Sequence, residues 1–271
     1  MKRNRDAVQA TGTQLLDRAV AVIKLLGQVG EHGARMAEIA DGLALKAPTA
    51  HRIVSALERH GLIERERSTK RYRLGLALFA LGATAADGTG LRKISRPALL
   101  RLATASGDTV FLMARSGFNV VCVDRQEGTY VLDSLTGHVG GQIPMGVGPG
   151  SQSILAFLPS DEAAAIVEAN TPLYPRYHGL TADSVREKLP QIREQHFALD
   201  DGELVRGISA LAVPILPQGR DAIASITINM TSARLGDRLE ELVALLKSEV
   251  GDIEQVINPL ERADGPARRI A

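Results

Sequence analysis

The stretch APTAHRIVSALERHGLIERERSTKRYRLG, residues 47–75, decides the fold of the N-terminal third of the chain. Its first half predicts a helix from about Ala47 to His60, because apolar residues recur at every third or fourth position. Pro48 is tolerated in the first turn, and Gly61 is placed to close the helix. The apolar stripe consists of Ala50, Ile53, Val54 and Leu57.

The opposite face of this predicted helix carries groups suited to nucleic acid. Hydroxyls, an imidazole and guanidinium groups can reach base edges and phosphates from within a major groove. A helix face that is merely solvated is the alternative. The residues predicted to contact DNA from this region are Lys46, Pro48, Thr49, His51, Arg52, Ser55 and Arg59.

Two short strands are predicted directly after this helix. They cover Leu62–Arg65 and Arg71–Leu74, and Glu66–Lys70 joins them as a hairpin. The tip of the hairpin is cationic and is predicted to contact the DNA backbone. Its predicted contact residues are Arg67, Ser68, Thr69, Lys70 and Arg71.

Two further helices precede the deciding stretch. One is predicted from Thr13 to Val29, with Gly30 available as a stop, and a shorter one from about Arg35 to Asp41. Gly42 is placed to end the shorter helix in a left-handed cap. Helix, turn, helix and then a cationic hairpin is the order of a winged helix-turn-helix, which predicts double-stranded DNA as a partner.

The charge distribution agrees with this interpretation. Residues 1–80 carry 14 Lys and Arg against 8 Asp and Glu, a net of +6, whereas residues 81–271 carry 18 against 23, a net of −5. A basic module beside an acidic one is a reasonable footprint for a polyanionic partner, because neutralised phosphates release counterions. Charge alone is weak evidence, since many small helical domains reach such a value.

Length and composition limit the remaining possibilities. At 271 residues, with ~100–200 residues per domain, the chain predicts two domains. The longest apolar runs, such as Ala210–Leu216, are far below the ~20 residues of a membrane-spanning helix, and no secretion core follows the N-terminal charges. We therefore expect a cytoplasmic protein without a membrane partner. Cys122 is the single cysteine, so an internal disulfide and a multi-cysteine metal site are excluded, and we expect it to be a core residue.

The C-terminal two-thirds mixes predicted helices and strands. The helices are Leu91–Thr104, Asp183–His196 with an interruption near Pro190, and Gly236–Ile257; the strands are Thr109–Ala114, Asn119–Asp124, Ser209–Leu216 and Ile223–Met230. This order predicts an α+β sheet domain and not a parallel doubly wound one. On the last strand Ser225, Thr227 and Asn229 line one face, which is either solvent-exposed or part of a pocket.

A glycine-rich segment, Gly137–Ser151, precedes a predicted apolar helix from Ser151 to Leu158. A loop that runs into a helix start presents backbone N–H groups and the positive end of the helix dipole, which suit a carboxylate or a phosphate. A tight structural turn is the alternative. Pro149 stands where a dinucleotide fingerprint needs backbone donors, and Ser151 lacks the frame of a nucleophile elbow.

Four segments of the first 80 residues resemble the DNA-binding domain of the IclR family of regulators. They are Ala37–Ala40, Ala50–Leu57, Gly61–Glu64 and Tyr72–Gly75. The resemblance extends over almost the whole chain and implies a linker helix followed by a GAF-like effector domain. The expected divisions are a basic tail over 1–12, a winged helix-turn-helix over 13–75, a linker helix over 76–90, an effector domain over 91–258 and a C-terminal tail over 259–271.

The resemblance also implies a pocket for a small organic acid. The residues that it suggests, together with neighbours in the glycine-rich segment, are Met145, Gly148, Pro149, Gly150, Ser151, Asp201, Ala210, Thr227 and Asn229. Two departures matter. Ala210 stands where the family often has a small polar side chain or a cysteine, and Pro149 replaces a residue that could donate its N–H. The identity of the ligand therefore does not transfer.

These observations predict a regulator and not an enzyme, with no cofactor and no metal. It would bind a near-palindromic operator as a homodimer or a dimer of dimers and regulate a neighbouring catabolic operon. An organic or aromatic acid would control this binding. The alternative is a metabolic enzyme or a ligand-binding protein whose N-terminal domain serves assembly. Its candidate catalytic groups are scattered, and Asp200–Glu203 is better explained as an exposed acidic turn. The candidates are His138, His178, His196, Asp200, Asp201 and Glu203.

Overall fold

A computed structural model describes residues 13–133, 135–136, 138–217 and 221–257 of the chain. The tails predicted over 1–12 and 259–271 lie outside the described residues. The chain forms two compact units, residues 1–88 and residues 89–271, and each is described by itself below.

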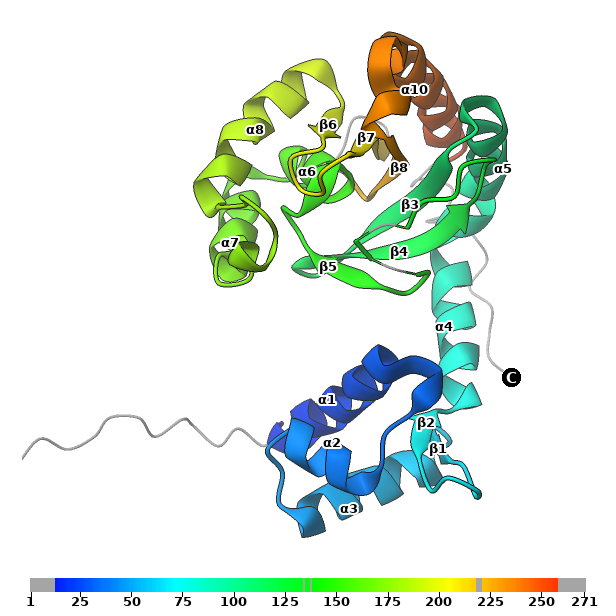
Figure 1. Cartoon of the computed structure of the whole chain (residues 1–271), viewed down its shortest axis with the longest axis vertical. Coiled ribbons are helices and arrows are strands. Elements are labelled where there is room, and N and C mark those ends of the chain that lie inside the picture. The colour runs from blue at the N-terminus through cyan, green and yellow to red at the C-terminus, as the bar shows by residue number, and fades with distance from the viewer. Residues whose placement is uncertain (1–12, 134, 137, 218–220, 258–271) are drawn as a thin grey trace, which may run out of the picture. The chain divides into compact units, whose positions relative to one another are not determined.

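The N-terminal unit consists of helices followed by a small hairpin (Figure 1). Its elements are α1 (Gln14–Val29), η1 (Gly30–His32), α2 (Met36–Gly42), α3 (Ala47–Arg59), β1 (Ile63–Arg65), β2 (Tyr72–Leu74) and α4 (Leu76–Thr89). The two strands are antiparallel, with Ile63 opposite Leu74 and Arg65 opposite Tyr72. The helix-turn-helix and the hairpin wing are thus confirmed.

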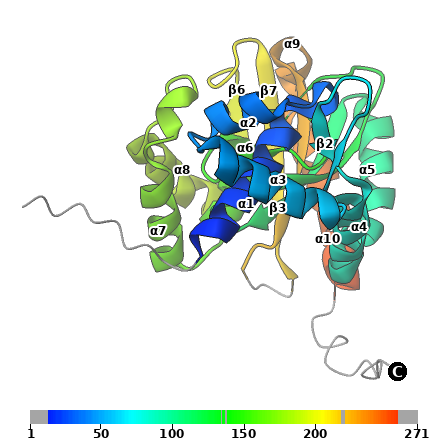
Figure 2. The same cartoon turned by 90° about the horizontal axis from the view of Figure 1, so that it is seen from below.

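Helices α1, α2 and α3 pack around one apolar core, and Figure 2 shows them grouped together. The predicted stripe of α3 is buried in this core, so the expected orientation of the helix is confirmed. Other core members come from α1, α2 and the hairpin: Val22, Leu26, Ile39, Ile63 and Tyr72.

The end of α2 differs from the prediction. Gly42 is the last residue of the helix, and the left-handed position falls on Ala44, with φ 49°. Leu45 N–H bonds to the carbonyl of Ala40 at 2.8 Å, and Ala44 N–H bonds to that of Asp41 at 3.1 Å. This bond pair is a Schellman motif, whose geometry puts the left-handed residue two positions later than the glycine suggested.

The C-terminal unit is built on one six-stranded antiparallel sheet in the order β5-β4-β3-β8-β7-β6. Its strands are β3 (Thr109–Ser116), β4 (Asn119–Gln126), β5 (Gln142–Pro144), β6 (Ala198–Asp201), β7 (Ile208–Ile215) and β8 (Ala224–Thr231). Its helices are α5 (Leu91–Ser106), α6 (Gly148–Ala156), α7 (Ser160–Asn170), η2 (Tyr174–Arg176), α8 (Ala182–Gln195), α9 (Ser232–Leu235), η4 (Gly236–Arg238) and α10 (Leu239–Val256). The predicted α+β class is confirmed.

Helices cover both faces of this sheet (Figure 1). Helices α5 and α10 pack on one face, whereas α6 lies against β3, β7 and β8 on the other, with α8 packed on α6 and α7 on α8. Because side chains alternate along a strand, each face has its own apolar core. Val110 and Leu112 of β3 belong to the core on the α5 and α10 side, and Phe111 and Met113 belong to the core on the α6 side.

Three local predictions for this unit need correction. Helix α8 is continuous through Pro190, whose place inside it removes one backbone bond without ending it. Helix α6 begins at Gly148, three residues before the predicted start, because Pro149 is compatible with the first turn of a helix. A 3-10 turn, Gly236–Arg238, precedes α10 where a single helix was expected.

Among the described residues, no helix is both long enough and apolar enough to cross a membrane.

Candidate functional site

The outer face of α3 is open to solvent. Pro48, His51, Arg52, Ser55 and Arg59 are exposed, as is Lys46 just before the helix, and Thr49 is half-buried. Within the described part of the chain, Arg52 and Arg59 form no ion pair with another side chain. Both guanidinium groups are therefore available to an outside partner.

The tip of the hairpin is also exposed. Arg67, Ser68, Thr69 and Lys70 all reach solvent, and Lys70 takes a left-handed φ of 60°. The Thr69 hydroxyl bonds to the Glu66 carboxylate, and Arg71 N–H donates to Thr69 Oγ1 at 3.3 Å. These bonds stabilise the turn. Arg67 and Lys70 form no ion pair with a carboxylate of the described residues.

Arg71 has a different role from the other cations of the tip. It is half-buried, and its Nη1 donates to Glu38 Oε2 at 2.9 Å and to the carbonyl of Gly33 at 2.9 Å. The Arg35 backbone N–H first, and then Arg71, hold the pKa of Glu38 below its usual value. The guanidinium of Arg71 thus ties the hairpin to α2 within the unit. Arg65, which is not among the predicted contact residues, is exposed on β1, and its guanidinium carbon lies 5.5 Å from the centroid of the Tyr72 ring.

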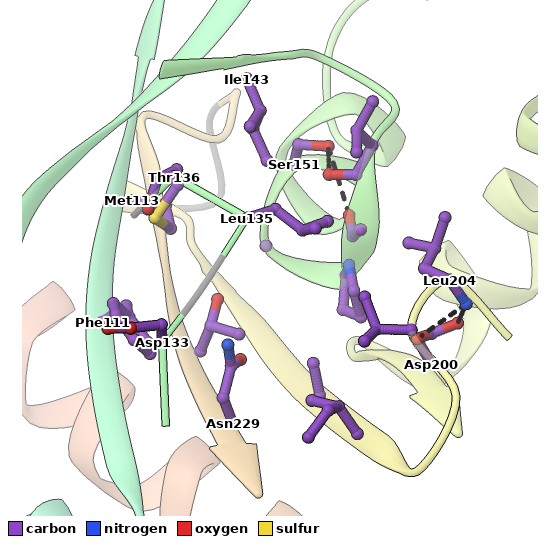
Figure 3. Close-up of a pocket in the computed structure, with 18 residues that line it drawn as sticks. Phe111, Met113, Asp133, Leu135, Thr136, Ile143, Ser151, Asp200, Leu204 and Asn229 are labelled. Carbon is purple, nitrogen blue, oxygen red and sulfur yellow. Dashed lines mark hydrogen bonds between the residues drawn. The ribbon is translucent and has the colours of Figure 1, made fainter. Parts of the chain in front are cut away.

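The C-terminal unit contains a cavity of about 270 Å³ between α6 and the sheet (Figure 3). The first turn of α6 forms one wall, and strands β3, β7 and β8 form another. Its lining residues are Phe111, Met113, Asp133, Leu135, Thr136, Ile143, Val147, Gly148, Pro149, Gly150, Ser151, Asp200, Leu204, Val205, Ile208, Ala210, Thr227 and Asn229.

The structure brings most of the suggested effector residues together at this cavity. Gly148, Pro149, Gly150, Ser151, Ala210, Thr227 and Asn229 all line it. Met145 and Asp201, though described, lie outside the lining. Met145 is buried in the core, where its carbonyl accepts a bond from the Tyr174 hydroxyl at 2.8 Å. Asp201 is exposed and binds the Ser209 hydroxyl, whereas Asp200 faces the cavity, because adjacent strand residues point to opposite faces.

Hydrogen bonds to Ser151 hold the residues that directly precede α6. Ser151 Oγ accepts the N–H of Gly146 at 2.9 Å and donates to the carbonyl of Val147 at 2.7 Å. Gly146 has a φ of 101°, and a Cβ there would lie 2.4 Å from the Tyr174 hydroxyl, so both its conformation and its surroundings require glycine. The start of α6 is therefore fixed in the fold.

Gly148 and Gly150 of the first turn of α6 line the cavity. An α-helix leaves its first N–H groups without intrahelical partners, and Pro149 has none to offer, so Gly148 and Gly150 supply them. The helix dipole adds partial positive charge at this end. Gly150 also lets α6 approach the sheet, since a Cβ there would lie 2.6 Å from Thr227 Oγ1.

Two polar side chains of β8 point into the cavity beside these donors. Thr227 is 6% exposed and Asn229 is 7% exposed. Within the described residues, Thr227 Oγ1 and Asn229 Oδ1 have no hydrogen-bond partner. Buried polar atoms are normally paired, so two such atoms in one cavity indicate a ligand or ordered water.

Asp200 is the buried acid of the cavity. It is 6% exposed, and its carboxylate accepts the N–H of Leu204 at 3.2 Å (Figure 3). Burial raises the pKa of Asp200. The prediction of an exposed acidic turn is therefore wrong for Asp200, which lies in a strand that the sequence pattern did not reveal.

Other lining residues escaped the sequence reasoning as well. Phe111 and Met113 come from β3, where the alternation of side chains was visible but the pairing with Thr227 and Ser225 of β8 was not. Among the described lining residues there is no Lys, Arg or His. Asp133 is the second acid and forms an ion pair with Arg125 at 2.8 Å.

The remaining reactive groups do not assemble into a second centre. His138, His178, His196 and Glu203 are absent from the cavity lining. No group of three or more His, Cys, Asp and Glu side chains suited to a metal ion occurs in the part of the chain that the structure describes. Cys122 is a buried core residue, as predicted, and burial raises its pKa to about 11.

Two family models match this chain. The model for the bacterial transcriptional regulator IclR C-terminal domain matches residues 83–255, and that for the IclR helix-turn-helix domain matches residues 15–67. The chain is 28% identical over 225 residues to the HTH-type transcriptional regulator KipR of Bacillus subtilis. The aligned region covers 82% of this chain and 89% of KipR.

Solved structures show the same fold. An IclR transcriptional regulator from Alicyclobacillus acidocaldarius superposes with a TM-score of 0.75 at 25% identity, covering 89% of this chain and 97% of that one. An IclR homologue from Microbacterium hydrocarbonoxydans, in complex with 4-hydroxybenzoate, gives a TM-score of 0.74 at 21% identity, covering 89% and 98%.

Proposed function

This chain belongs to the IclR family of bacterial transcriptional regulators, and we propose on that premise that a small carboxylic acid bound in its C-terminal unit controls its binding to an operator. The relatives are transcriptional regulators and not enzymes. One observation carries the proposal for the acid: the first turn of α6 and two unpartnered polar atoms face the same cavity.

A carboxylate is the ligand group that this end of the cavity favours. The N–H groups of Gly148 and Gly150 and the positive end of the helix dipole attract an anion. Thr227 Oγ1 lies beside this turn, close to Gly150, and can donate to a second oxygen. The body of the ligand would lie against apolar side chains such as Phe111 and Ile208. The Microbacterium homologue, whose ligand is 4-hydroxybenzoate, supports an acid of this size by analogy.

The DNA contacts are proposed for α3 and the hairpin tip. Arg52 and Arg59 project from the exposed face of α3, and Arg67 and Lys70 project from the tip. A helix of this kind enters the major groove, while the wing contacts phosphates. Arg71 is proposed to contribute less to DNA binding than the other cations of the tip, because its guanidinium already donates hydrogen bonds to Glu38 and to the carbonyl of Gly33.

The active form is proposed to be a homodimer or a dimer of dimers on a near-palindromic operator. Apolar side chains of the N-terminal unit support this, since Leu15 and Leu16 of α1 and Leu76 and Phe79 of α4 are exposed. The two residues of each pair are neighbours on their helix, and adjoining exposed apolar side chains are typical of a surface that another chain covers. The operator is proposed to control a neighbouring catabolic operon whose pathway supplies the acid.

Retardation of a DNA fragment tests the regulator assignment. The fragment upstream of the gene should bind the full chain, with an affinity that falls steeply as salt rises, because bound phosphates release counterions. Arg52→Ala should weaken binding by about 1–3 kcal/mol if Arg52 contacts a base. Lys24→Ala removes an exposed cation from α1 and should leave the affinity nearly unchanged. An Arg52→Ala protein that binds as well as the Lys24→Ala protein would remove Arg52 from the interface.

A further inference from the structure

Three neighbouring strands place Asp200, Ala210 and Asn229 in one row across the sheet. The register pairs Asp200 of β6 with Ala210 of β7, and Ala210 with Asn229 of β8. Side chains of directly paired residues stand on the same face of a sheet. All three residues line the cavity, so this row forms part of its floor.

The middle residue of the row leaves space between the outer two. Ala210 carries only a methyl group, whereas its neighbours in the row carry polar side chains that rise above it. Adjacent strands lie ~4.8 Å apart, so the Cα atoms of Asp200 and Asn229 are about 10 Å from each other. One small molecule lying over Ala210 can therefore reach both side chains.

Both ends of the row present acceptor atoms to the cavity. The Asp200 carboxylate accepts the N–H of Leu204 and has further lone pairs. Asn229 Oδ1 has no partner among the described residues. Since no Lys, Arg or His occurs in the described lining, a ligand is the natural source of a donor for Asn229 Oδ1 and of a further donor for Asp200.

We propose that the effector is a carboxylic acid with at least two hydroxyl groups on the part of its skeleton remote from the carboxylate. Its carboxylate binds at the first turn of α6, and its hydroxyls donate to Asp200 and Asn229 across Ala210. This inference rests on the proposed function, because it takes the same cavity as the effector site. An acid without hydroxyls would cover these acceptors, leaving Asn229 Oδ1 unpaired and Asp200 with only backbone donors such as the Leu204 N–H. The loss of such hydrogen bonds would weaken its binding.

Calorimetric titration of the full chain with two six-carbon acids tests this class. Gluconate carries hydroxyls along its chain, and hexanoate carries none. We expect gluconate to bind at least about tenfold more tightly than hexanoate, the factor that one lost hydrogen bond of ~1.4 kcal/mol produces. The aromatic pair 3,4-dihydroxybenzoate and benzoate, titrated in the same way, should show the same preference in a flat ligand.

Variants of the row show whether Asp200 causes the preference. Asp200→Leu should remove most of it, and Asp200→Asn, which keeps one acceptor oxygen, should keep part of it. Asp201→Leu changes the next residue of β6, which lies outside the lining, and should leave the preference intact. Circular dichroism establishes that each variant is folded.

The outcomes are distinct. Failure of both hydroxylated acids to bind, equal or tighter binding of the unsubstituted acids, or a preference that survives Asp200→Leu would each overturn the proposal. Retardation of the operator fragment by the same protein preparations shows whether only the proposed effector class is wrong or the regulator assignment as well. A protein that retards its operator but prefers hexanoate remains a regulator with a different effector, whereas a wild-type protein that retards no fragment contradicts the regulator assignment itself.

Discussion

Strand β8 presents different chemistry on its two sides. Ile226, Ile228 and Met230 point toward α5 and α10 and are fully buried in an apolar core. Ser225, Thr227 and Asn229, which alternate with them, point toward α6 and are almost as deeply buried. Ser225 donates to the carbonyl of Gly150 at 2.8 Å, but the other two have unpartnered oxygen atoms among the described residues.

The difference separates stability from binding within one strand. On the α5 and α10 side, every buried side chain of the strand adds hydrophobic free energy to the fold. On the α6 side, each buried and unpaired polar group costs about 1–3 kcal/mol until a partner supplies its hydrogen bond. We therefore expect substitutions on the two sides to have opposite effects on the free energy of unfolding.

The largest effect is expected on the apolar side. Ile228→Ala should lower the free energy of unfolding by about 2–5 kcal/mol, because it leaves a cavity in a fully buried core. Urea denaturation measures the loss. Ile223→Ala, at a position that is 41% exposed, is the control and should change stability by no more than about 0.5 kcal/mol. Equal losses for the two variants would contradict the assignment of this side to stability.

The contact between α6 and β8 should give the next largest effect. Gly150→Ala places a methyl group 2.6 Å from Thr227 Oγ1 and 3.2 Å from Met113 Cγ, which should cost about 1–3 kcal/mol of overpacking. Thr227→Ala in the same protein should restore part of the loss, and a double-mutant cycle measures this coupling. Gly251→Ala in α10, where a Cβ meets nothing within 4 Å, should instead stabilise the protein by up to about 1 kcal/mol.

A hydroxyl on the polar side should show the opposite sign. Thr227→Val keeps the shape of the side chain and removes an unpartnered buried oxygen, so the free energy of unfolding should rise by about 1 kcal/mol while affinity for the effector falls. Thr109→Val is the matched control. The Thr109 hydroxyl donates to the carbonyl of Tyr130 at 3.1 Å and accepts the N–H of Leu132 at 2.9 Å, so its loss should destabilise the protein. A Thr227→Val protein less stable than the wild type would show that this hydroxyl already has a partner in the fold.

The smallest effect concerns pH. Burial raises the pKa of Asp200 above its ordinary value of 3.8, so the folded state favours the protonated acid. The stability that this provides is present below pH 3.8 and is lost as pH rises through the folded-state pKa. Asp200→Asn should therefore raise the melting temperature at neutral pH, and the gain should shrink as the solution is acidified. Parallel scans of Asp201→Asn correct for the loss of one negative charge; a gain from Asp200→Asn that is independent of pH would contradict the prediction.

Much of this fold could be predicted from the sequence, because its signals are local. The stripe of α3 and the alternation along β8 each lie within one element, so periodicity identifies them. The short strands β5 and β6 lack enough residues for a pattern. The density of glycine and proline hid the first turn of α6, since these residues usually mark loops.

The site could be predicted only in part, because it depends on pairing between distant segments. Asp200 and Asp201 are neighbours in the sequence, and only the register with β7 shows which of them faces the cavity. Phe111 joins the lining because β3 pairs with β8. Arg71 belongs to the cationic hairpin by sequence, but its bonds to Glu38 and Gly33 depend on how the hairpin folds back against α2.

The order of strands in the sheet has a consequence for aggregation. Both edges are formed by the shortest strands, β5 with three residues and β6 with four, whereas each of the four inner strands has eight. An edge exposes unpaired backbone groups that can recruit a strand from another chain. Because each edge is so short, little backbone is open to such recruitment. The C-terminal unit can thus contain a wide, strongly apolar sheet that offers little template for its extension.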